Sequence, residues 1–159
     1  MTANKANPPE PVAEFLRGRR LAVAGVSRSS GQAANAVYKR LRDSGYEALP
    51  INPRSTIVEG VTCYPNLAAI PGRVNGLVIA THPDIAVELV RECASTGVRQ
   101  VWLHRSFGQG SVSSAAVQEC AARGIACIVG GCPLMFCRPV DLGHRCMRWL
   151  LQRQGRAPR

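Results

Sequence analysis

Residues 20–31 read Arg-Leu-Ala-Val-Ala-Gly-Val-Ser-Arg-Ser-Ser-Gly, an apolar run that leads into a small loop rich in hydroxyl groups. A short apolar run that ends in glycine is typical of a buried parallel strand. Ala34, Val37 and Tyr38 follow with helical spacing, which predicts a helix over residues 32–44. The stretch therefore predicts a strand, a loop and a helix in succession.

The same succession of a helix, a glycine and an apolar strand occurs three times along the chain. The three junctions are Gly45-Tyr46, Gly97-Val98 and Gly124-Ile125. Glycine caps helices in the left-handed conformation, and alternating strands and helices favour right-handed βαβ units. The sequence thus predicts a single Rossmann-like, doubly wound α/β domain with about five parallel strands and flanking helices. The expected strands are 20–25, 46–51, 76–81, 98–104 and 125–129, and the expected helices are 32–44, 83–97, 111–123 and 139–152.

The length of the chain and its ends define the expected domain. With 159 residues, of which 46% are hydrophobic, the chain has the size and the core of one domain, expected over residues 11–152. Residues 1–10 are polar and proline-rich and are expected to form a flexible leader, and residues 153–159 a disordered basic tail. The leader lacks the apolar run of a signal peptide, and seven cysteines without such a signal favour reduced thiols in the cytoplasm.

Basic residues outnumber acidic ones, and the excess is unevenly placed. The formal net charge is +10 at pH 7, with eight bases and two acids in residues 17–54 and six arginines and one acid in residues 138–159. This charge favours a nucleic acid, a membrane surface or a small polyanion such as a nucleotide. The sequence has no recognition motif or aromatic platform for nucleic acid and no membrane span, so a small nucleotide-like ligand is the expected partner.

The loop at residues 25–31 lies between an expected strand and an expected helix, where backbone N–H groups and the helix dipole favour an anion. Ser27, Ser29 and Ser30 can donate hydrogen bonds, and Arg28 can pair with a phosphate. The same composition also suits an ordinary strand-to-helix turn, so the loop alone leaves both interpretations open. Its glycine spacing and its lack of lysine do not fit a Walker A loop.

The segment after the second expected strand indicates what kind of nucleotide would fit. Dinucleotide-binding folds usually carry an acid there, which contacts the ribose of adenosine. In this chain residues 52–54 are Asn-Pro-Arg, and the first loop lacks the Gly-x-Gly-x-x-Gly pattern. An arginine suits a phosphate on the ribose, so Arg54 predicts a ligand such as NADP or coenzyme A (CoA), both of which carry one.

Five short motifs, in order along the chain, carry a family resemblance. They are Leu21-Ala-Val-Ala-Gly-Val-Ser-Arg28, Gly45-Tyr46 with Pro50-Ile-Asn-Pro53, Val61 with Cys63-Tyr-Pro65-Asn-Leu67, Val101-Trp-Leu103, and Cys132-Pro133. Together they resemble the stand-alone bacterial CoA-binding domain proteins, which are similar to the N-terminal CoA-binding domain of the succinyl-CoA synthetase alpha subunit. The resemblance covers about residues 12–135.

This resemblance implies a Rossmann-like sheet that binds CoA or an acyl-CoA. It implies that the first loop meets the CoA phosphates, that the base after Asn-Pro pairs with a phosphate, and that the segment after the fourth strand contacts the ligand. The candidate CoA-binding residues are Gly25, Val26, Ser27, Arg28, Ser29, Ser30, Asn52, Pro53, Arg54, His104, Arg105 and Ser106. The chain departs from the family at His104, where glutamine is usual, and at apolar residues 134–136. The synthetase uses a phosphorylated histidine in a second domain, so its ligase activity is not expected here.

Cys132 and His104 are the weak candidates for a catalytic role. Cys132 follows two glycines after the fifth expected strand, where a thiolate could attack CoA derivatives or form a mixed disulfide with CoA. The alternative is a packed cysteine whose apolar neighbours raise its pKa. His104 has no evident carboxylate partner. We therefore expect a non-catalytic or regulatory CoA-binding protein, and the alternative is an NADP- or CoA-dependent enzyme that uses Cys132 or His104.

Cysteines near the carboxyl terminus also raise the question of zinc. Cys127, Cys132 and Cys137 are evenly spaced, with His144 and Cys146 beyond them. This spacing does not bring two thiolates together in the manner of a zinc knuckle, so no metal site is expected.

Overall fold

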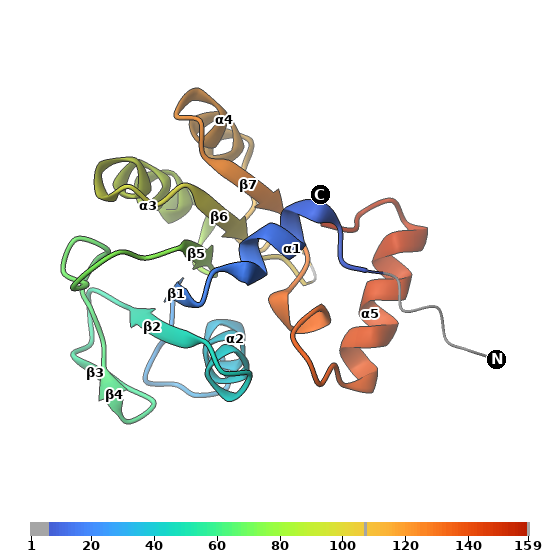
Figure 1. Cartoon of the computed structure of the whole chain (residues 1–159), viewed down its shortest axis with the longest axis horizontal. Helices are drawn as coiled ribbons and strands as arrows, with labels where there is room; N and C mark the ends of the chain where they lie inside the picture. The colour runs from blue at the N-terminus through green and yellow to red at the C-terminus, as the bar shows by residue number, and fades with distance from the viewer. Residues whose placement is uncertain (1–6, 107, 159) are drawn as a thin grey trace.

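A sheet of five parallel strands forms the centre of the computed structural model, which describes residues 7–106 and 108–158 (Figure 1). The strands are β1 (Arg20–Ala24), β2 (Glu47–Ile51), β5 (Gly76–Ile79), β6 (Gln100–Leu103) and β7 (Ala126–Val129). Their order across the sheet is β2-β1-β5-β6-β7, and each neighbouring pair is parallel. The predicted Rossmann-like, doubly wound α/β fold is therefore confirmed.

Helices cover both faces of the sheet because successive side chains of each strand point to opposite faces. The helices are α1 (Glu10–Arg17), α2 (Ala33–Asp43), α3 (Pro83–Thr96), α4 (Ser114–Ala122) and α5 (Leu142–Arg153). Helices α1, α2 and α5 lie on one side of the sheet, and α3 and α4 lie on the other (Figure 1). Val23 and Val78 pack with the first group, and their neighbours Ala22 and Leu77 pack with the second.

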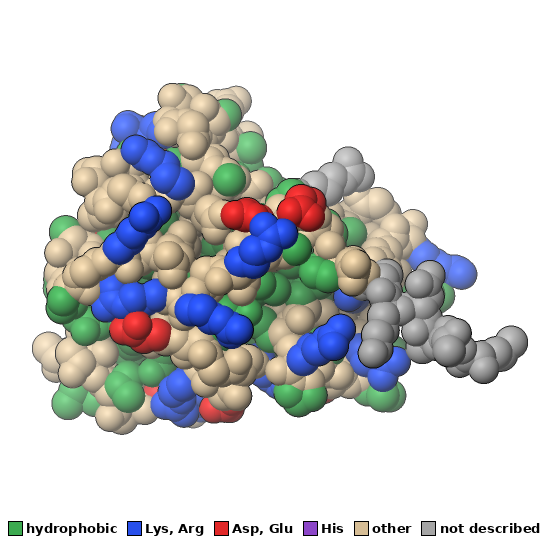
Figure 2. All heavy atoms as spheres, in the orientation of Figure 1, with side chains coloured by type: hydrophobic (Ala, Val, Ile, Leu, Met, Phe, Trp, Pro, Cys, Tyr) green, Lys and Arg blue, Asp and Glu red, His purple; other side chains and the backbone are tan. Residues whose placement is uncertain are grey.

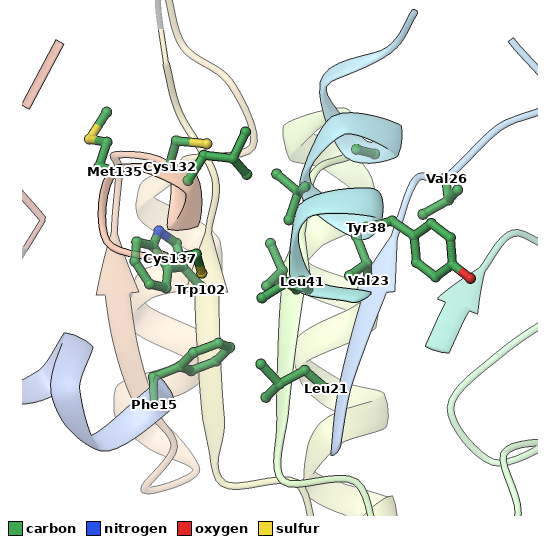
Figure 3. Close-up of a cluster of buried hydrophobic side chains, with 14 of the residues drawn as sticks. Phe15, Leu21, Val23, Val26, Tyr38, Leu41, Trp102, Cys132, Met135 and Cys137 are labelled. Atoms are coloured by element: carbon green, nitrogen blue, oxygen red, sulfur yellow. The ribbon is translucent and has the colours of Figure 1, made fainter. Parts of the chain in front are cut away.

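Large side chains fill the core between the sheet and the first group of helices (Figure 3). Phe15 of α1 packs edge-to-face on Trp102 of β6, with the ring centroids 5.5 Å apart. Both side chains are buried, and the Trp102 indole N–H donates to the Gly130 carbonyl at 2.9 Å. Burial of a side chain such as Phe15 contributes about 1.5–3 kcal/mol, so α1 belongs to the folded domain.

Helix α1 and two short elements are not predicted from the sequence. Helix α1 has Pro9 at its N-cap and begins at Glu10, one residue before the expected start of the domain. Residues 1–6 of the expected leader lie outside the described residues. The two short elements are a hairpin of β3 (Ile57–Val58) and β4 (Val61–Thr62) and a single 3-10 turn, η1 (Pro133–Met135).

The segment after α5, expected to be a disordered tail, makes a contact with the domain. Pro158 is buried, and a Cβ atom added to Gly131 would be 2.8 Å from its ring. This part of the tail therefore packs on the turn that follows β7.

Basic side chains are spread over the face shown in Figure 2 and do not form one patch there. Some have acidic partners: Arg17 pairs with Glu10 and Glu14, and Arg20 pairs with Glu47 at 2.9 Å. The positive charge is therefore partly neutralised locally. Among the helices described, none has the length and apolar character needed to cross a bilayer.

Candidate functional site

The loops after β1 and β5 meet where the strand order of the sheet reverses, which is where open α/β sheets bind ligands. Gly25 follows β1 with a φ of +100°, and a Cβ atom there would be 2.4 Å from the Ala80 carbonyl oxygen. Only glycine accepts both this φ and this close approach. Gly25 therefore allows the two loops to lie against each other at the carboxyl edge of the sheet.

Asn35 of α2 holds the loop after β1. Its side chain is fully buried, and its oxygen accepts from the Ser27 N–H at 3.0 Å while its amide donates to the Ser27 carbonyl at 2.7 Å. The same amide donates to the Glu59 carboxylate at 2.6 Å. The Ser27 hydroxyl oxygen accepts from the Ser29 N–H at 3.1 Å, so this hydroxyl is engaged within the loop. Asn35 is not among the residues predicted for the site, although a polar residue beside the apolar stripe of a helix is a usable signal.

Asn52 links the loop after β1 to the loop after β2. Its side-chain amide donates to the Val26 carbonyl at 2.8 Å, and its side-chain oxygen accepts from the Arg54 N–H at 2.8 Å. Val26 is buried and Asn52 is half-buried. Both were candidate CoA-binding residues, and in the structure they shape the site through packing and hydrogen bonds to backbone.

A surface pocket of ≈ 520 Å³ brings Arg28 and Arg54 together. Its lining residues are Arg28, Pro53, Arg54, Ser55, Thr56, Ile57, Cys63 and Pro65. Both arginines are exposed, and neither guanidinium forms an ion pair with a carboxylate of the described residues. Two cations at one pocket repel each other, so an anion between them is favoured.

The first turn of α2 adds to the positive character near Arg28. Ser29 and Ser30 are exposed in the loop that leads to this helix. Gln32 is the N-cap, and its side chain makes no capping hydrogen bond. The positive end of the helix dipole is therefore not capped by Gln32 and lies near the predicted anion-binding loop.

His104 and Ser106 follow β6 in a more buried part of the same edge. The Ser106 hydroxyl oxygen lies 3.3 Å from His104 Nε2, and the His104 carbonyl accepts from the Ser111 N–H at 2.8 Å. Burial, and then the neighbouring His144, lowers the pKa of His104 to about 4. The imidazole is therefore neutral at pH 7.

Arg105 packs on the turn after β7. Its N–H donates to the Gly131 carbonyl at 2.9 Å, and a Cβ atom added to Gly130 would be 3.0 Å from its Nη2 atom. Residues 104–106 are not among those that line the pocket of Arg28 and Arg54. The candidate residues therefore fall into two groups along the edge of the sheet.

Cys132, the weak nucleophile candidate, is 3% exposed and lies near Ser106. Burial raises the pKa of the Cys132 thiol to about 11, the Asp141 carboxylate also raises it, and hydrogen bonds from the Leu134 backbone and the Ser106 hydroxyl lower it. The direction of the shift is the one predicted from the apolar neighbours. At neutral pH the group is a thiol and not a thiolate.

The cysteines considered for zinc are not gathered around a common point. Within residues 7–106 and 108–158, no group of three His, Cys, Asp or Glu side chains is placed to hold a metal ion. Cys127 instead forms a hydrogen bond with Cys120, which raises the pKa of Cys127. Burial raises the pKa of Cys137 to about 12.

The strand order and the pocket define a Rossmann-like α/β domain with a basic pocket at the carboxyl edge of its sheet. The chain belongs to the family described as CoA binding domain, whose sequence model matches residues 19–138. The predicted family is therefore confirmed, and the match covers every candidate CoA-binding residue.

Some relatives are larger enzymes, and this chain matches only a part of each. ADP-forming acetate–CoA ligase II of Archaeoglobus fulgidus is 31% identical over 81 residues, which are 50% of this chain and 12% of that protein. The alpha subunit of ADP-forming acetate–CoA ligase II of Pyrococcus furiosus is 31% identical over 88 residues, 55% of this chain and 19% of that subunit. The matched stretch therefore covers less than a fifth of the ligase and less than a fifth of the ligase subunit.

Other relatives have the size of this domain. The uncharacterized protein YneT of Bacillus subtilis is 27% identical over 116 residues, which are 73% of this chain and 83% of that protein. A hypothetical protein from Pyrococcus horikoshii OT3 shares the fold with a TM-score of 0.72 at 24% identity, covering 82% of this chain and 94% of that one.

Proposed function

We propose that this protein binds CoA or an acyl-CoA with its nucleotide end in the pocket of Arg28 and Arg54. The observation that carries the proposal is the convergence on one pocket of two arginines, from two different loops, that form no ion pair with a carboxylate of the described residues. The family is described as a CoA binding domain, so CoA is the anionic ligand that we assign to this pocket. The names of two relatives, both acetate–CoA ligases, also include CoA.

Each group of residues at or near the pocket is assigned to one part of the ligand. Arg28, with Ser29 and Ser30 in the loop that leads to α2, pairs with the phosphates that join adenosine to the pantetheine arm. Arg54 pairs with the phosphate on the ribose. Ile57 is 62% exposed and lines the same pocket, where it offers the adenine ring an apolar contact. The arm extends along the edge of the sheet towards residues 104–106.

The proposed role is non-catalytic or regulatory binding in the cytoplasm. Acyl transfer or thiol chemistry needs an activated nucleophile or a placed base. Cys132 is protonated at neutral pH because burial raises its pKa to about 11. His104 is neutral, and its nearby side-chain partner is the Ser106 hydroxyl, which cannot orient it as a carboxylate would. These properties favour binding over the alternative of an NADP- or CoA-dependent enzyme.

Thermal unfolding with added ligand tests the proposal. CoA at a hundred times its Kd should stabilise the fold by about 2.7 kcal/mol, which for a chain of this size raises Tm by about 5–10 °C. The shift should shrink in Arg28→Ala and persist in Arg99→Ala, since Arg99 is exposed just before β6, at the opposite edge of the sheet. No shift at millimolar CoA, or a shift with NADP and none with CoA, would contradict the proposal.

A further inference from the structure

Glu59 stands at an unusual backbone position beside the pocket. It occupies the first position of the two-residue turn between β3 and β4, with a φ of +49°, and Gly60 follows with a φ of +75°. Among the described residues, Glu59 is the only non-glycine residue with a positive φ. Such hairpin turns favour Asn-Gly or Asp-Gly, and a glutamate in this conformation persists only where its surroundings hold it.

The contacts of the Glu59 side chain explain why this turn has a glutamate and not the shorter aspartate or asparagine. Its carboxylate accepts from the Asn35 amide at 2.6 Å and lies 3.1 Å from the Lys39 ammonium, and both partners belong to α2. The side chain is only 13% exposed. The hydrogen bond from Asn35 lowers the pKa of Glu59, so the carboxylate is ionised at neutral pH. Asparagine or aspartate, which the turn prefers, has one methylene fewer with which to reach α2.

The contact with Asn35 extends to the loop that carries Arg28. A carboxylate only accepts hydrogen bonds, so it fixes which end of the Asn35 side chain is the donor. In that orientation the Asn35 oxygen faces the Ser27 N–H at 3.0 Å, and its amide faces the Ser27 carbonyl at 2.7 Å. Both peptide groups of Ser27 are thereby held, and Arg28 is the next residue in the chain.

The hairpin contributes to the lining of the pocket. Ile57 belongs to β3, and it lines the pocket together with Arg28 and Arg54. The hydrogen bonds between Glu59 and Asn35 and between Asn35 and Ser27 therefore connect the hairpin, which carries Ile57, to the loop that carries Arg28. Lys39 offsets the negative charge that Glu59 would otherwise direct at an anionic ligand.

We infer that Glu59 is a positioning residue for ligand binding, which fixes the loop of Arg28 against the β3–β4 hairpin by holding Asn35. This inference rests on the proposed binding of CoA. Glu59 itself does not contact the ligand, and its effect passes through Asn35 and Ser27. Loss of the contact leaves the pocket residues present but less well placed, which weakens binding without unfolding the domain.

Three variants separate positioning from folding. Glu59→Asn suits the turn better but shortens the side chain, so Tm should stay the same or rise while the Kd for CoA rises about tenfold. Glu59→Gln keeps the length and an acceptor for Asn35 and should recover most of the affinity, to within about threefold of the wild type. Glu47→Asn, which removes an exposed glutamate paired with Arg20 at 2.9 Å, serves as the control and should leave the Kd unchanged.

A double-mutant cycle gives a measurement that a merely structural role would not move. In an Arg28→Ala background there is no guanidinium to place, so Glu59→Asn should weaken CoA binding much less than it does in the wild type. Additive losses would overturn the inference, and so would wild-type affinity in Glu59→Asn or equal weakness in Glu59→Gln. If Glu59→Asn fails to fold, Glu59→Gly replaces it, since glycine accepts a φ of +49°. Absence of CoA binding in the wild type would instead refute the proposed function.

Discussion

Replacement of Arg54 by alanine should change the selectivity of the site and not only its affinity. Arg54 lines the pocket from the loop after β2, and Asn52 holds its backbone N–H at 2.8 Å. The side chain is the one assigned to the phosphate on the ribose. Dephospho-CoA lacks that phosphate, so the wild type should bind CoA more tightly than dephospho-CoA, and Arg54→Ala should bind the two ligands almost equally.

The size of the effect follows from the exposure of Arg54. A hydrogen bond to a charged group contributes about 1.5–3 kcal/mol, and the lower end applies because Arg54 is exposed and screened by salt. A loss of about 1.5 kcal/mol raises the Kd for CoA roughly tenfold. The Kd for dephospho-CoA should rise by no more than about twofold, because only the general attraction of the cation is lost.

Isothermal titration of both ligands at a fixed ionic strength measures the four dissociation constants. Arg99→Ala serves as the control for the loss of one exposed cation, and its ratio of the two constants should match that of the wild type. Equal losses for CoA and dephospho-CoA in Arg54→Ala would refute the assignment, because Arg54 would then contact a part that both ligands share.

Three further results are expected from the geometry. Gly25→Ala should lower the free energy of unfolding, measured in urea, by about 2–4 kcal/mol, because the new Cβ would lie 2.4 Å from the Ala80 carbonyl oxygen and the φ is +100°. Gly31→Ala is the control: a Cβ there meets no atom within 4 Å, so the free energy of unfolding should change by less than about 0.5 kcal/mol. The pKa of His104 is about 4 in the folded state and near 6.5 in the unfolded chain. The free energy of unfolding should therefore fall by about 3 kcal/mol as the pH drops from 6.5 towards 4, because the unfolded chain takes up a proton that the folded state does not. His104→Gln should flatten this dependence of the free energy of unfolding on pH. Alkylation of Cys132 should be slow at pH 7 and still accelerate above pH 9, as followed by peptide mass spectrometry, whereas a fast reaction at pH 7 that CoA blocks would favour the enzyme alternative.

The fold was predictable because its signals are local and repeated. Each glycine that ends a helix, such as Gly97 with its left-handed φ of +79°, is followed closely by an apolar strand. The observed strands are shorter than expected: β6 ends at Leu103, and His104 already lies in the loop. Strand ends depend on backbone pairing with neighbours, which the residues of one segment do not encode.

The convergence of Arg28 and Arg54 was predictable for a topological reason. Both follow parallel strands, β1 and β2, that pair in register from Arg20 to Ala24, so both loops leave the same edge of the sheet. The prediction of residues 104–106 as ligand contacts rests on the family resemblance, and their contact with a ligand stays a prediction.

The positioning contacts could not be predicted from the sequence. The hairpin strands β3 and β4 have two residues each, too short to show a period, and Glu59 meets Asn35 only because the hairpin folds back on α2. Helix α1 has a recognisable start in Pro9 and Glu10, but its role depends on the packing of Phe15 against Trp102, far along the chain. Such contacts join distant segments and leave no local pattern.

Native mass spectrometry of the purified protein tests the central claim most directly. We expect a species heavier than the chain by the mass of CoA or an acyl-CoA, either in the purified protein or after addition of CoA. The double variant Arg28→Ala/Arg54→Ala should lose most of this complex, and Arg99→Ala should lose none of it. A wild-type protein that stays free of ligand at millimolar CoA, or a complex that survives loss of both pocket arginines, would contradict the central claim.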